Sequence, residues 1–405
     1  MNTLHTVRYG QDREIQFSLN DDCDLTQCRA SGNALADPSA AVTAALESPE
    51  GFPPFSSACV PGDQVVIAVD DHVPCAVDVV NGAVRALKSG PAGGEIQIRV
   101  LCASQDTATR IAERLQLDTI AHDPDNRKEL TYLAASKEGL PIYFNRLLHE
   151  ADVVVPIGAA QPLASLGHHS ASGGLYPAFA DSAARGRFQA ARDADGEAGW
   201  KQRHDEASEA AWLLGVQFAV QVVAGPDDTA MHVVAGDTES VARKSQPLCE
   251  QAWCFEPATS APLVIAAIDG EAVQTWDHFA RALHTARRIA DEDADIVLCT
   301  TLAVPPGPAL RQLASDLVDD ELERELRRRH TPDVLAAQLL FETLPTAHVH
   351  LISDLDPNVV EELGMTPLEP GDLERIASRH GRCLMLPSAH RAAVRWLQAT
   401  DAPSA

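Results

Sequence analysis

The sequence has few basic residues and no long apolar run. Its 405 residues include 32 Lys and Arg against 58 Asp and Glu, a formal net charge of −26. A phosphate backbone or an anionic membrane would repel such a chain, so neither nucleic acid nor membrane is expected as a partner. The apolar runs are strand-sized, too short to span a bilayer, and the polar start has no signal-peptide core. The sequence therefore predicts a cytoplasmic protein.

Tightly spaced cysteines and the common nucleotide and catalytic motifs are also missing. The nine cysteines include no CxxC pair, which favours reduced, buried thiols over a disulfide scaffold or a structural zinc site. No GxGxxG fingerprint, Walker loop, GxSxG elbow or HExxH helix occurs. The sequence therefore does not predict Rossmann-type dinucleotide binding, P-loop chemistry, or hydrolysis by those motifs.

Short β-branched runs alternate with helical patterns along the whole chain. Apolar runs at 64–69, 152–156 and 263–268 are typical of parallel strands that are covered on both faces. Apolar residues spaced by three or four over 276–289 predict an amphipathic helix. The alternation predicts an α/β protein with mainly parallel sheets.

The length fits two domains. A polar stretch with two prolines at 256–262 is the best linker candidate. It predicts an N-terminal α/β domain over residues 1–257 and a C-terminal α/β domain over 258–389, with a ligand cleft between them. A final helix over 390–405 is expected to pack back on the first domain.

Two acidic residues and a histidine directly follow the strand at 64–69. Asp70, Asp71 and His72 stand beyond its carboxyl end, where open α/β sheets bind ligands. A carboxylate and an imidazole in this place can orient a hydroxyl, transfer a proton or bind a metal. The alternative is that the acidic residues cap a helix that has Pro74 in its first turn.

A glycine-containing loop with paired histidines follows the strand at 152–156. His168 and His169 lie in this loop, ahead of a Ser-Gly-Gly sequence. A Gly-Gly pair lets the backbone approach a ligand closely, and backbone amides of such a loop can hold a phosphate. The alternative is a solvated loop with an exposed histidine pair. The candidate ligand-binding residues of this loop are Ser172, Gly173 and Gly174.

The remaining histidines give weaker signals. His204 begins a predicted helix. It would either cap this helix or act as a ligand. It belongs to the segment 181–205, which has few large apolar residues and is expected to be an exposed loop or mobile helix bordering the site. His348 and His350 share one face of a predicted strand and are expected to be structural histidines.

These motifs, in this order, resemble the nickel-dependent lactate racemase family over nearly the whole chain. The sequence VVIAVDDH at 65–72 is similar to the family's strand followed by Ser-Asp-His-Thr-Arg-Pro. Ser-Gly-Gly at 172–174 resembles the Ser-Gly-Gly ahead of the family's catalytic Arg-Lys. The segment 233–239 is similar to its Ala-Gly-Asp-Met-Glu turn, and 350–354 to its Phe-Val-Ser-Asp sequence.

The resemblance implies two α/β domains that enclose a nickel-pincer nucleotide cofactor. The implied reaction is racemisation or epimerisation of a 2-hydroxy acid by hydride transfer, so the implied ligand is a small hydroxy acid or a related carboxylate. The residues expected to transfer protons are Asp71, His72, His168, His169 and Tyr176. The residues expected to contact the cofactor are Ser172, Gly173 and Gly174. The residues expected to bind the metal are His168, His169 and His204.

Three segments, among other places, depart from the family pattern. Residues 73–75 lack the substrate-orienting Arg, and 103–106 lack a catalytic His. Leu175 and Tyr176 stand where the family has Arg and the Lys that tethers the cofactor covalently. Losing one general base typically costs ~10²–10⁴-fold in rate. Three interpretations stay open: a divergent racemase, a catalytically degenerate ligand-binding or regulatory paralogue, and a different enzyme that uses Asp71 and the paired histidines around another divalent metal.

Overall fold

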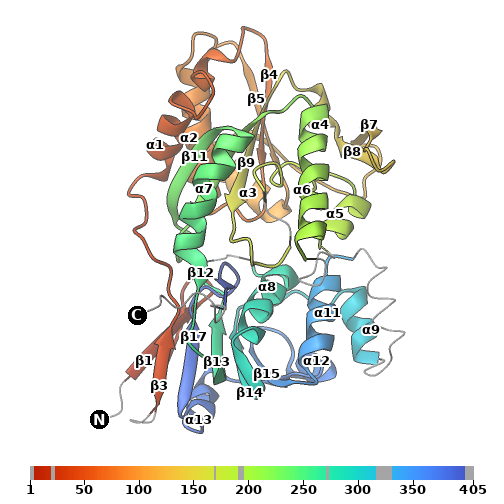
Figure 1. Ribbon diagram of the computed structural model, residues 1–405. Coiled ribbons are helices and arrows are strands. Elements are labelled where there is room, and N and C mark those ends of the chain that lie inside the picture. The colour runs from red at the N-terminus through yellow and green to blue at the C-terminus, as the bar shows by residue number, and fades with distance from the viewer. Residues whose placement is uncertain are drawn as a thin grey trace, which may run out of the picture. The chain divides into compact units, whose positions relative to one another are not determined.

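The computed structural model consists of two compact units (Figure 1). It describes residues 4–19, 23–167, 170–189, 196–270, 273–315 and 331–396. Unit 1 comprises Met1–Ser31, Pro162–Leu166 and Ala252–Ala405, and unit 2 comprises Gly32–Gln161 and Gly167–Gln251. Each unit is built on a six-stranded, mainly parallel sheet with helices against it. The predicted α/β class is confirmed.

The sheet of unit 2 reverses its strand order at β4. The chain runs from β4 to β5 and β6 on one side, then returns to place β9 on the other side of β4. These four strands are parallel, and β10 and β11 extend the sheet beyond β9 as an antiparallel pair. The β4–β9 boundary is therefore a topological switch point, where ligands of open α/β sheets bind. The strands, in the order of the sheet, are β11 (Ala230–Asp237), β10 (Phe218–Ala224), β9 (Val153–Ala160), β4 (Gln64–Val69), β5 (Gln97–Cys102) and β6 (Asp118–Ala121).

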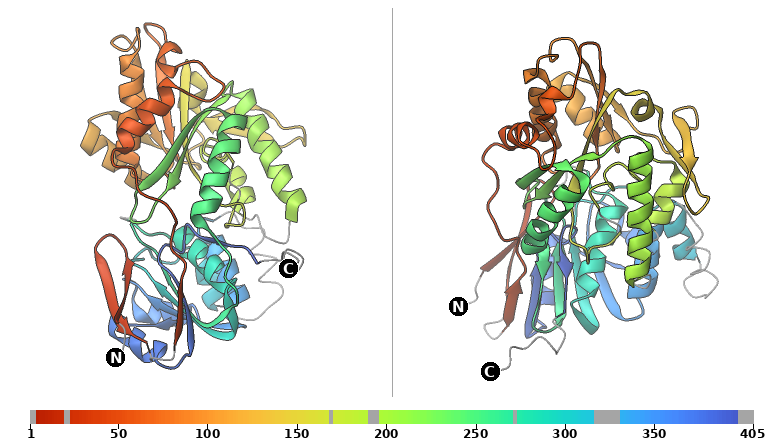
Figure 2. Two further views of the ribbon diagram at one scale, coloured as in Figure 1. Left: turned by 60° about the vertical axis from the view of Figure 1, so that its left-hand side comes forward. Right: turned by 45° about the horizontal axis from the view of Figure 1, so that its top comes forward.

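Both faces of this sheet are covered, which explains the continuous apolar run of β4. Val65 and Ile67 pack with α1 and α2, whereas Val66 and Ala68 pack with Tyr176 and α6. Figure 2 shows α1 and α2 on one side of the sheet and α6 on the other. A hairpin of β7 (Leu130–Ala135) and β8 (Pro141–Asn145) adds to the α6 side. The helices are α1 (Pro38–Glu47), α2 (Ala76–Ser89), α3 (Gln105–Leu115), α4 (Arg146–Glu150), α5 (Ser182–Gln189), α6 (Gly196–Leu213) and α7 (Thr238–Trp253), with a 3-10 turn at Phe55–Ser57.

The sheet of unit 1 is parallel throughout and has its own switch point. The chain runs from β13 to β14 and β15, then returns to place β17 on the other side of β13. The short strands β16 and β3 form the two edges of the sheet. The strands, in the order of the sheet, are β16 (Thr366–Pro367), β15 (Ala347–Ile352), β14 (Ala290–Cys299), β13 (Ala261–Ala267), β17 (Arg382–Leu386) and β3 (Asp24–Gln27).

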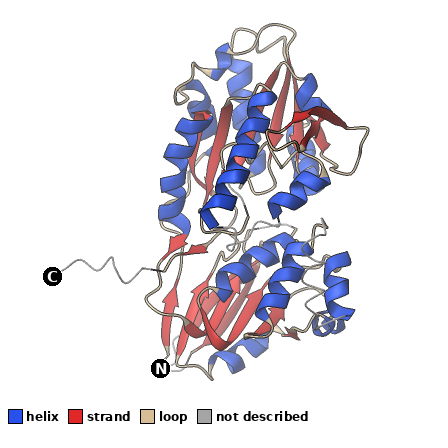
Figure 3. Ribbon diagram, turned by 45° about the vertical axis from the view of Figure 1, so that its right-hand side comes forward, coloured by secondary structure: helices blue, strands red, loops and turns tan. Residues whose placement is uncertain are grey.

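Helices cover one face of the unit 1 sheet, as Figure 3 shows for α8 and its neighbours. A β-hairpin and α13 cover the other face, where Phe17 and Ile376 pack with Leu263. The elements of these layers are α8 (Trp276–Arg287), α9 (Pro308–Ser315), α11 (Val334–Thr343), α12 (Pro357–Glu362), α13 (Leu373–Ala377), the hairpin β1 (Leu4–Tyr9) and β2 (Arg13–Ser18), the pair β12 (Cys254–Phe255) and β18 (Ala393–Val394), and a 3-10 turn at Pro370–Asp372.

The two ends of the chain differ from the sequence-based layout. That layout has residues 1–257 in one domain and 258–389 in the other, whereas β3 pairs with β17 and so joins the first residues to unit 1. Residues 390–396 do not form the predicted final helix, because β18 pairs with β12 there; residues 397–405 lie outside the described residues. Among the described helices, none is long and apolar enough to cross a membrane.

Candidate ligand site at a sheet switch point

The loop after β4 lies at the carboxyl edge of unit 2, beside the end of β9. The Asp70 N–H donates to the Ile157 carbonyl of β9 at 3.0 Å, which fixes the start of this loop. Asp71 and His72 follow and are half-buried. The structure thus places both residues at the switch point, where the sequence predicts a ligand.

The helix-capping alternative for the acidic residues is not observed. The N-cap of α2 is Cys75, which has a positive φ of 39° and makes no side-chain capping bond. Asp70 Oδ1 instead accepts a hydrogen bond from the Asp71 N–H at 2.9 Å. The ligand-binding role of Asp71 and His72 stays a prediction.

The Ser-Gly-Gly loop packs directly onto β9. A Cβ added at Gly174 would lie 3.0 Å from the Cα of Gly158, so this approach needs glycine. The N–H of Gly173 donates to Ser170, and the N–H groups of Leu175 and Tyr176 donate to the Ser172 carbonyl. These amides are therefore used within the loop. The predicted cofactor-binding role of Ser172, Gly173 and Gly174 stays a prediction.

One basic residue of this edge was not predicted from the sequence. Arg185, on α5, has Nη2 3.9 Å from Oδ2 of Asp71, and the two side chains are 25% and 31% exposed. The composition of the segment 181–205 predicts that it borders the site, but nothing in the local sequence separates Arg185 from its neighbours.

Tyr176 is a fully buried residue of the unit 2 core. Its ring contacts Phe144 and Phe188, and its hydroxyl donates to Glu206 Oε1 at 2.9 Å. Arg187 Nη2 donates to the same carboxylate oxygen at 2.7 Å. Burial, followed by the negative charge of Glu206, raises the pKa of the Tyr176 hydroxyl far above its usual range. The phenol therefore stays protonated and bonded, so the predicted catalytic role of Tyr176 gains no support from this geometry.

Of the three predicted metal ligands, the structure describes only His204. His204 was expected to begin a helix, but it lies inside α6 (Gly196–Leu213), which starts earlier, so it does not cap the helix start. Its ring is stacked on Trp200 at a centroid distance of 4.9 Å. His168 and His169 lie outside the described residues. Among the residues that are described, no three His, Cys, Asp or Glu side chains are grouped to hold a metal ion. The metal site therefore stays a prediction.

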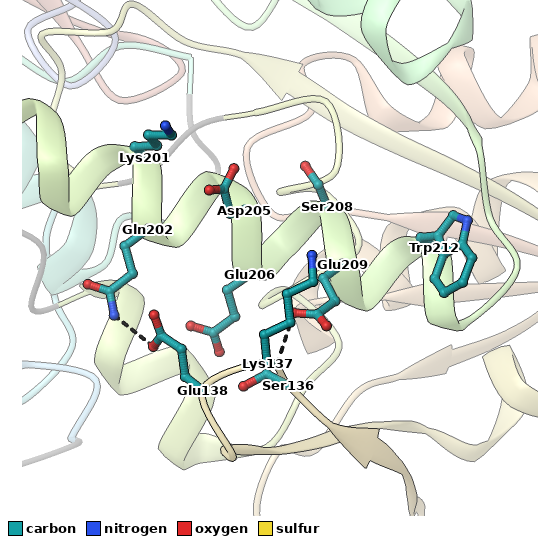
Figure 4. A pocket seen from close by; sticks show the side chains of 10 residues that line it. All are labelled: Ser136, Lys137, Glu138, Lys201, Gln202, Asp205, Glu206, Ser208, Glu209 and Trp212. Atoms are coloured by element: carbon teal, nitrogen blue, oxygen red, sulfur yellow. Dashed lines mark hydrogen bonds between the residues drawn. The ribbon is translucent and has the colours of Figure 1, made fainter.

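A cavity of about 1050 Å³ lies between α6 and the turn that joins β7 to β8 (Figure 4). Two hydrogen bonds connect its walls, from Gln202 to Glu138 at 2.8 Å and from the Lys137 N–H to Glu209 at 3.3 Å. Glu206 lines the cavity and also holds Tyr176. None of the individually predicted site residues lines it, but three lining residues belong to the segment 181–205 that was expected to border a site. The lining residues are Ser136, Lys137, Glu138, Lys201, Gln202, Asp205, Glu206, Ser208, Glu209 and Trp212.

The switch point of unit 1 also gathers polar residues, which sequence reasoning missed. Asp269 follows β13 and accepts a hydrogen bond from Ser388, which follows β17, at 2.8 Å. The rings of His278 and His390 meet edge to face at 5.7 Å. All four side chains are buried. Asp269 meets Ser388 because β13 and β17 are neighbours, and His390 meets His278, which lies on α8.

A histidine–aspartate–histidine cluster lies elsewhere in the same sheet. His350 Nε2 lies 2.7 Å from Asp295 Oδ1, and His380 Nε2 lies 2.8 Å from Oδ2. Burial of Asp295 opposes its ionisation, but the two histidine hydrogen bonds outweigh burial and lower the pKa of this carboxyl. The pairing of His350 agrees with its predicted structural role.

Comparisons with known proteins agree with this architecture. The family described as "Lactate racemase N-terminal domain" matches residues 9–184. The lactate racemase apoprotein from Thermoanaerobacterium thermosaccharolyticum superposes with a TM-score of 0.78 at 17% identity, covering 97% of this chain and 100% of that chain. A protein from Thermotoga maritima superposes with a TM-score of 0.67 at 13% identity, covering 89% of this chain and 99% of that chain. No curated protein sequence matches the chain.

The lactate racemase likeness allows a test of the implied cofactor against the residues present. Covalent attachment through the family's Lys would require a nucleophilic side chain at the position of Tyr176. The residue there is a buried phenol that donates to Glu206 and has a raised pKa. A covalently tethered nickel-pincer nucleotide therefore does not fit this position.

Proposed function

We propose that the chain binds a small 2-hydroxy acid, or a related carboxylate, at the β4–β9 switch point without a covalently tethered nickel-pincer cofactor. The substrate class is supported by the likeness to the lactate racemase apoprotein. The absence of a tether is supported by one observation above all, the burial and hydrogen bonding of Tyr176. On this proposal the chain is a ligand-binding relative of lactate racemase rather than a racemase.

The contacts of Tyr176 are incompatible with a covalent bond to a cofactor. A phenol that attacked a cofactor would need to lose its proton, but burial and Glu206 both oppose this loss. Turning the ring outward would also break the contacts with Phe144 and Phe188. The residue therefore maintains the core instead of holding a cofactor.

Racemisation or epimerisation is the second candidate, and Asp71 with His72 favours it. The two residues are adjacent in the loop after β4, and a carboxylate and an imidazole are groups that can take and return a hydroxyl proton. A hydride acceptor would also be required, and on this candidate it would be held without a covalent bond.

The test uses the full chain, produced together with the enzymes that make the nickel-pincer cofactor. D- and L-lactate are titrated into the protein by calorimetry, and each enantiomer is assayed for conversion by chiral chromatography. Binding without conversion is expected. Conversion would establish the second candidate, and no binding of either enantiomer would refute the proposal.

A matched pair of variants locates the binding. Asp71→Asn removes the carboxylate at the switch point, and Asp78→Asn removes an exposed carboxylate in the first turn of α2. We expect lactate binding to weaken about tenfold or more in the first variant and to stay unchanged in the second. Equal binding by both variants would place the ligand elsewhere.

A further inference from the structure

The position of Arg185 is fixed by the first turn of α5. Asp181 is 4% exposed, and its Oδ1 accepts the N–H of Ala184 at 3.0 Å. Its carbonyl accepts the N–H of Arg185 at 3.0 Å, and Ser182 N–H donates to the Pro124 carbonyl at 3.3 Å. The start of the helix is therefore anchored at several points, and the backbone that carries Arg185 is preorganised.

The guanidinium of Arg185 has unused hydrogen-bonding capacity. Its distance of 3.9 Å from Asp71 exceeds the 2.7–3.2 Å of an N–H···O bond. Its side chain donates no hydrogen bond to any residue that the structure describes. Arg187, two positions along the chain, is by contrast bonded to Glu206 at 2.7 Å. Arg185 therefore presents a half-buried cation whose N–H donors can meet an anion.

The pair of Arg185 and Asp71 is complementary to the two polar groups of a 2-hydroxy acid. A guanidinium binds a carboxylate through two parallel hydrogen bonds, and a carboxylate accepts a hydrogen bond from a hydroxyl. The carboxylate and the 2-hydroxyl of such an acid are on adjacent carbons, so they suit a donor and an acceptor that lie close together. In a chain with a net charge of −26, a specific basic residue is needed to hold a small anion.

We infer that Arg185 binds the carboxylate of the ligand, while Asp71 accepts its 2-hydroxyl group. This inference rests on the proposed function and adds the residue that selects for an anionic ligand. It assigns the two ends of the ligand to two different elements, α5 and the loop after β4. Arg185 would leave its loose contact with Asp71 and form direct hydrogen bonds to the ligand.

The experiment compares three probes on the full chain by calorimetry: L-lactate, lactamide, which lacks the charge, and acetate, which lacks the hydroxyl. Arg185→Gln is expected to weaken lactate and acetate binding about 10- to 100-fold and to leave lactamide binding unchanged. Arg185→Lys keeps the charge without the forked geometry and is expected to lie between the wild type and Arg185→Gln. Arg243→Gln, an exposed site on α7, is the matched control and is expected to bind like the wild type.

The outcomes separate this inference from the proposed function. If wild type binds lactate and Arg185→Gln binds it equally well, the inference is overturned and the proposed function stands. If Arg185→Gln binds neither lactate nor lactamide, Arg185 maintains the structure of the site instead of recognising the carboxylate, and the inference is overturned as well. If wild type binds none of the probes, the proposed function fails and the inference fails with it.

Discussion

Each of the two switch points of the molecule holds an aspartate with a polar partner, but the two pairs differ in exposure and in the distance between partners. At the β4–β9 edge of unit 2, Asp71 and Arg185 are a quarter to a third exposed and 3.9 Å apart. At the β13–β17 edge of unit 1, Asp269 and Ser388 are at most 5% exposed and share a hydrogen bond of 2.8 Å. Arg185 can exchange its long ion pair for a ligand at little cost, whereas the buried pair of Asp269 and Ser388 is part of the packing.

The difference shows that residue type and topological position do not by themselves identify a binding site. Both edges satisfy the rule that ligands bind beyond the carboxyl ends of strands at a reversal of strand order. Among the residues that the structure describes at these two edges, partial exposure and a cation with unused donors are combined at the edge of unit 2. The following predictions test this distinction.

The largest effect is expected at Tyr176, which belongs to the packed part of unit 2. Tyr176→Ala should lower the free energy of unfolding by about 3–5 kcal/mol, because it removes a fully buried ring. Tyr132→Ala, at a tyrosine that is 55% exposed, should change it by less than about 0.5 kcal/mol. Urea unfolding of both variants measures the difference. A similarly small loss of unfolding free energy in both variants would show that the Tyr176 ring does not support the core.

The buried edge of unit 1 should depend on Ser388. Ser388→Ala leaves the Asp269 carboxylate without this donor and should destabilise the protein by about 1–3 kcal/mol. The same urea experiment measures it, with Ser378→Ala at an exposed position as the control. If Ser388→Ala left the free energy of unfolding unchanged, the Asp269–Ser388 pair would not contribute to packing, and the two edges would no longer differ in this respect.

The histidine–aspartate–histidine cluster should make unit 1 sensitive to acid. The folded state lowers the pKa of Asp295, so its carboxylate stabilises the fold above the unfolded value of about 4. That contribution is lost as the pH falls through the lowered value. Asp295→Asn should therefore cost about 1–2 kcal/mol at pH 7 and flatten the pH dependence of unfolding below pH 4.

The control for this cluster is Asp293→Asn, an exposed position on the same strand. Its unfolding free energy should follow that of the wild type from pH 7 down to the acid range. If the free energy of unfolding fell equally steeply with acid in wild type and Asp295→Asn, Asp295 would not be the source of the acid sensitivity.

The smallest effect on stability is expected at Arg185. Arg185→Gln in the absence of ligand should change the free energy of unfolding by about 0–1 kcal/mol, because its ion pair is long and partly exposed. The main effect expected of this variant is weaker lactate binding. A loss of more than about 2 kcal/mol without ligand would make Arg185 a structural residue like Arg187.

Local patterns predicted the fold well because they depend on neighbours in the sequence. The predicted strand at 64–69 coincides with β4 (Gln64–Val69), since a β-branched run covered on both faces is readable without tertiary information. The same logic placed Asp71 and His72 beyond the end of a strand. The placement of β3 beside β17 was not readable, because an edge strand of four residues has almost no pattern of its own.

The contacts that define the candidate site could not be predicted, because they join distant parts of the chain. Arg185 meets Asp71 only because α5 returns to the carboxyl edge of the sheet. The resemblance implied proton transfer by Tyr176, which stands where the family has its tethering Lys, whereas its hydroxyl is bonded to Glu206 of α6. The sequence indicates which loops border the site, and the fold decides which side chains remain available to a ligand.

The most direct test of the central claim is the intact mass of the denatured protein after production with the cofactor-synthesis enzymes. A lactate racemase produced in the same way is the positive control for covalent attachment. The expected mass is that of the unmodified chain, 43.3 kDa, because the phenol of Tyr176 is buried and bonded to Glu206. A mass increased by a nucleotide adduct would contradict it.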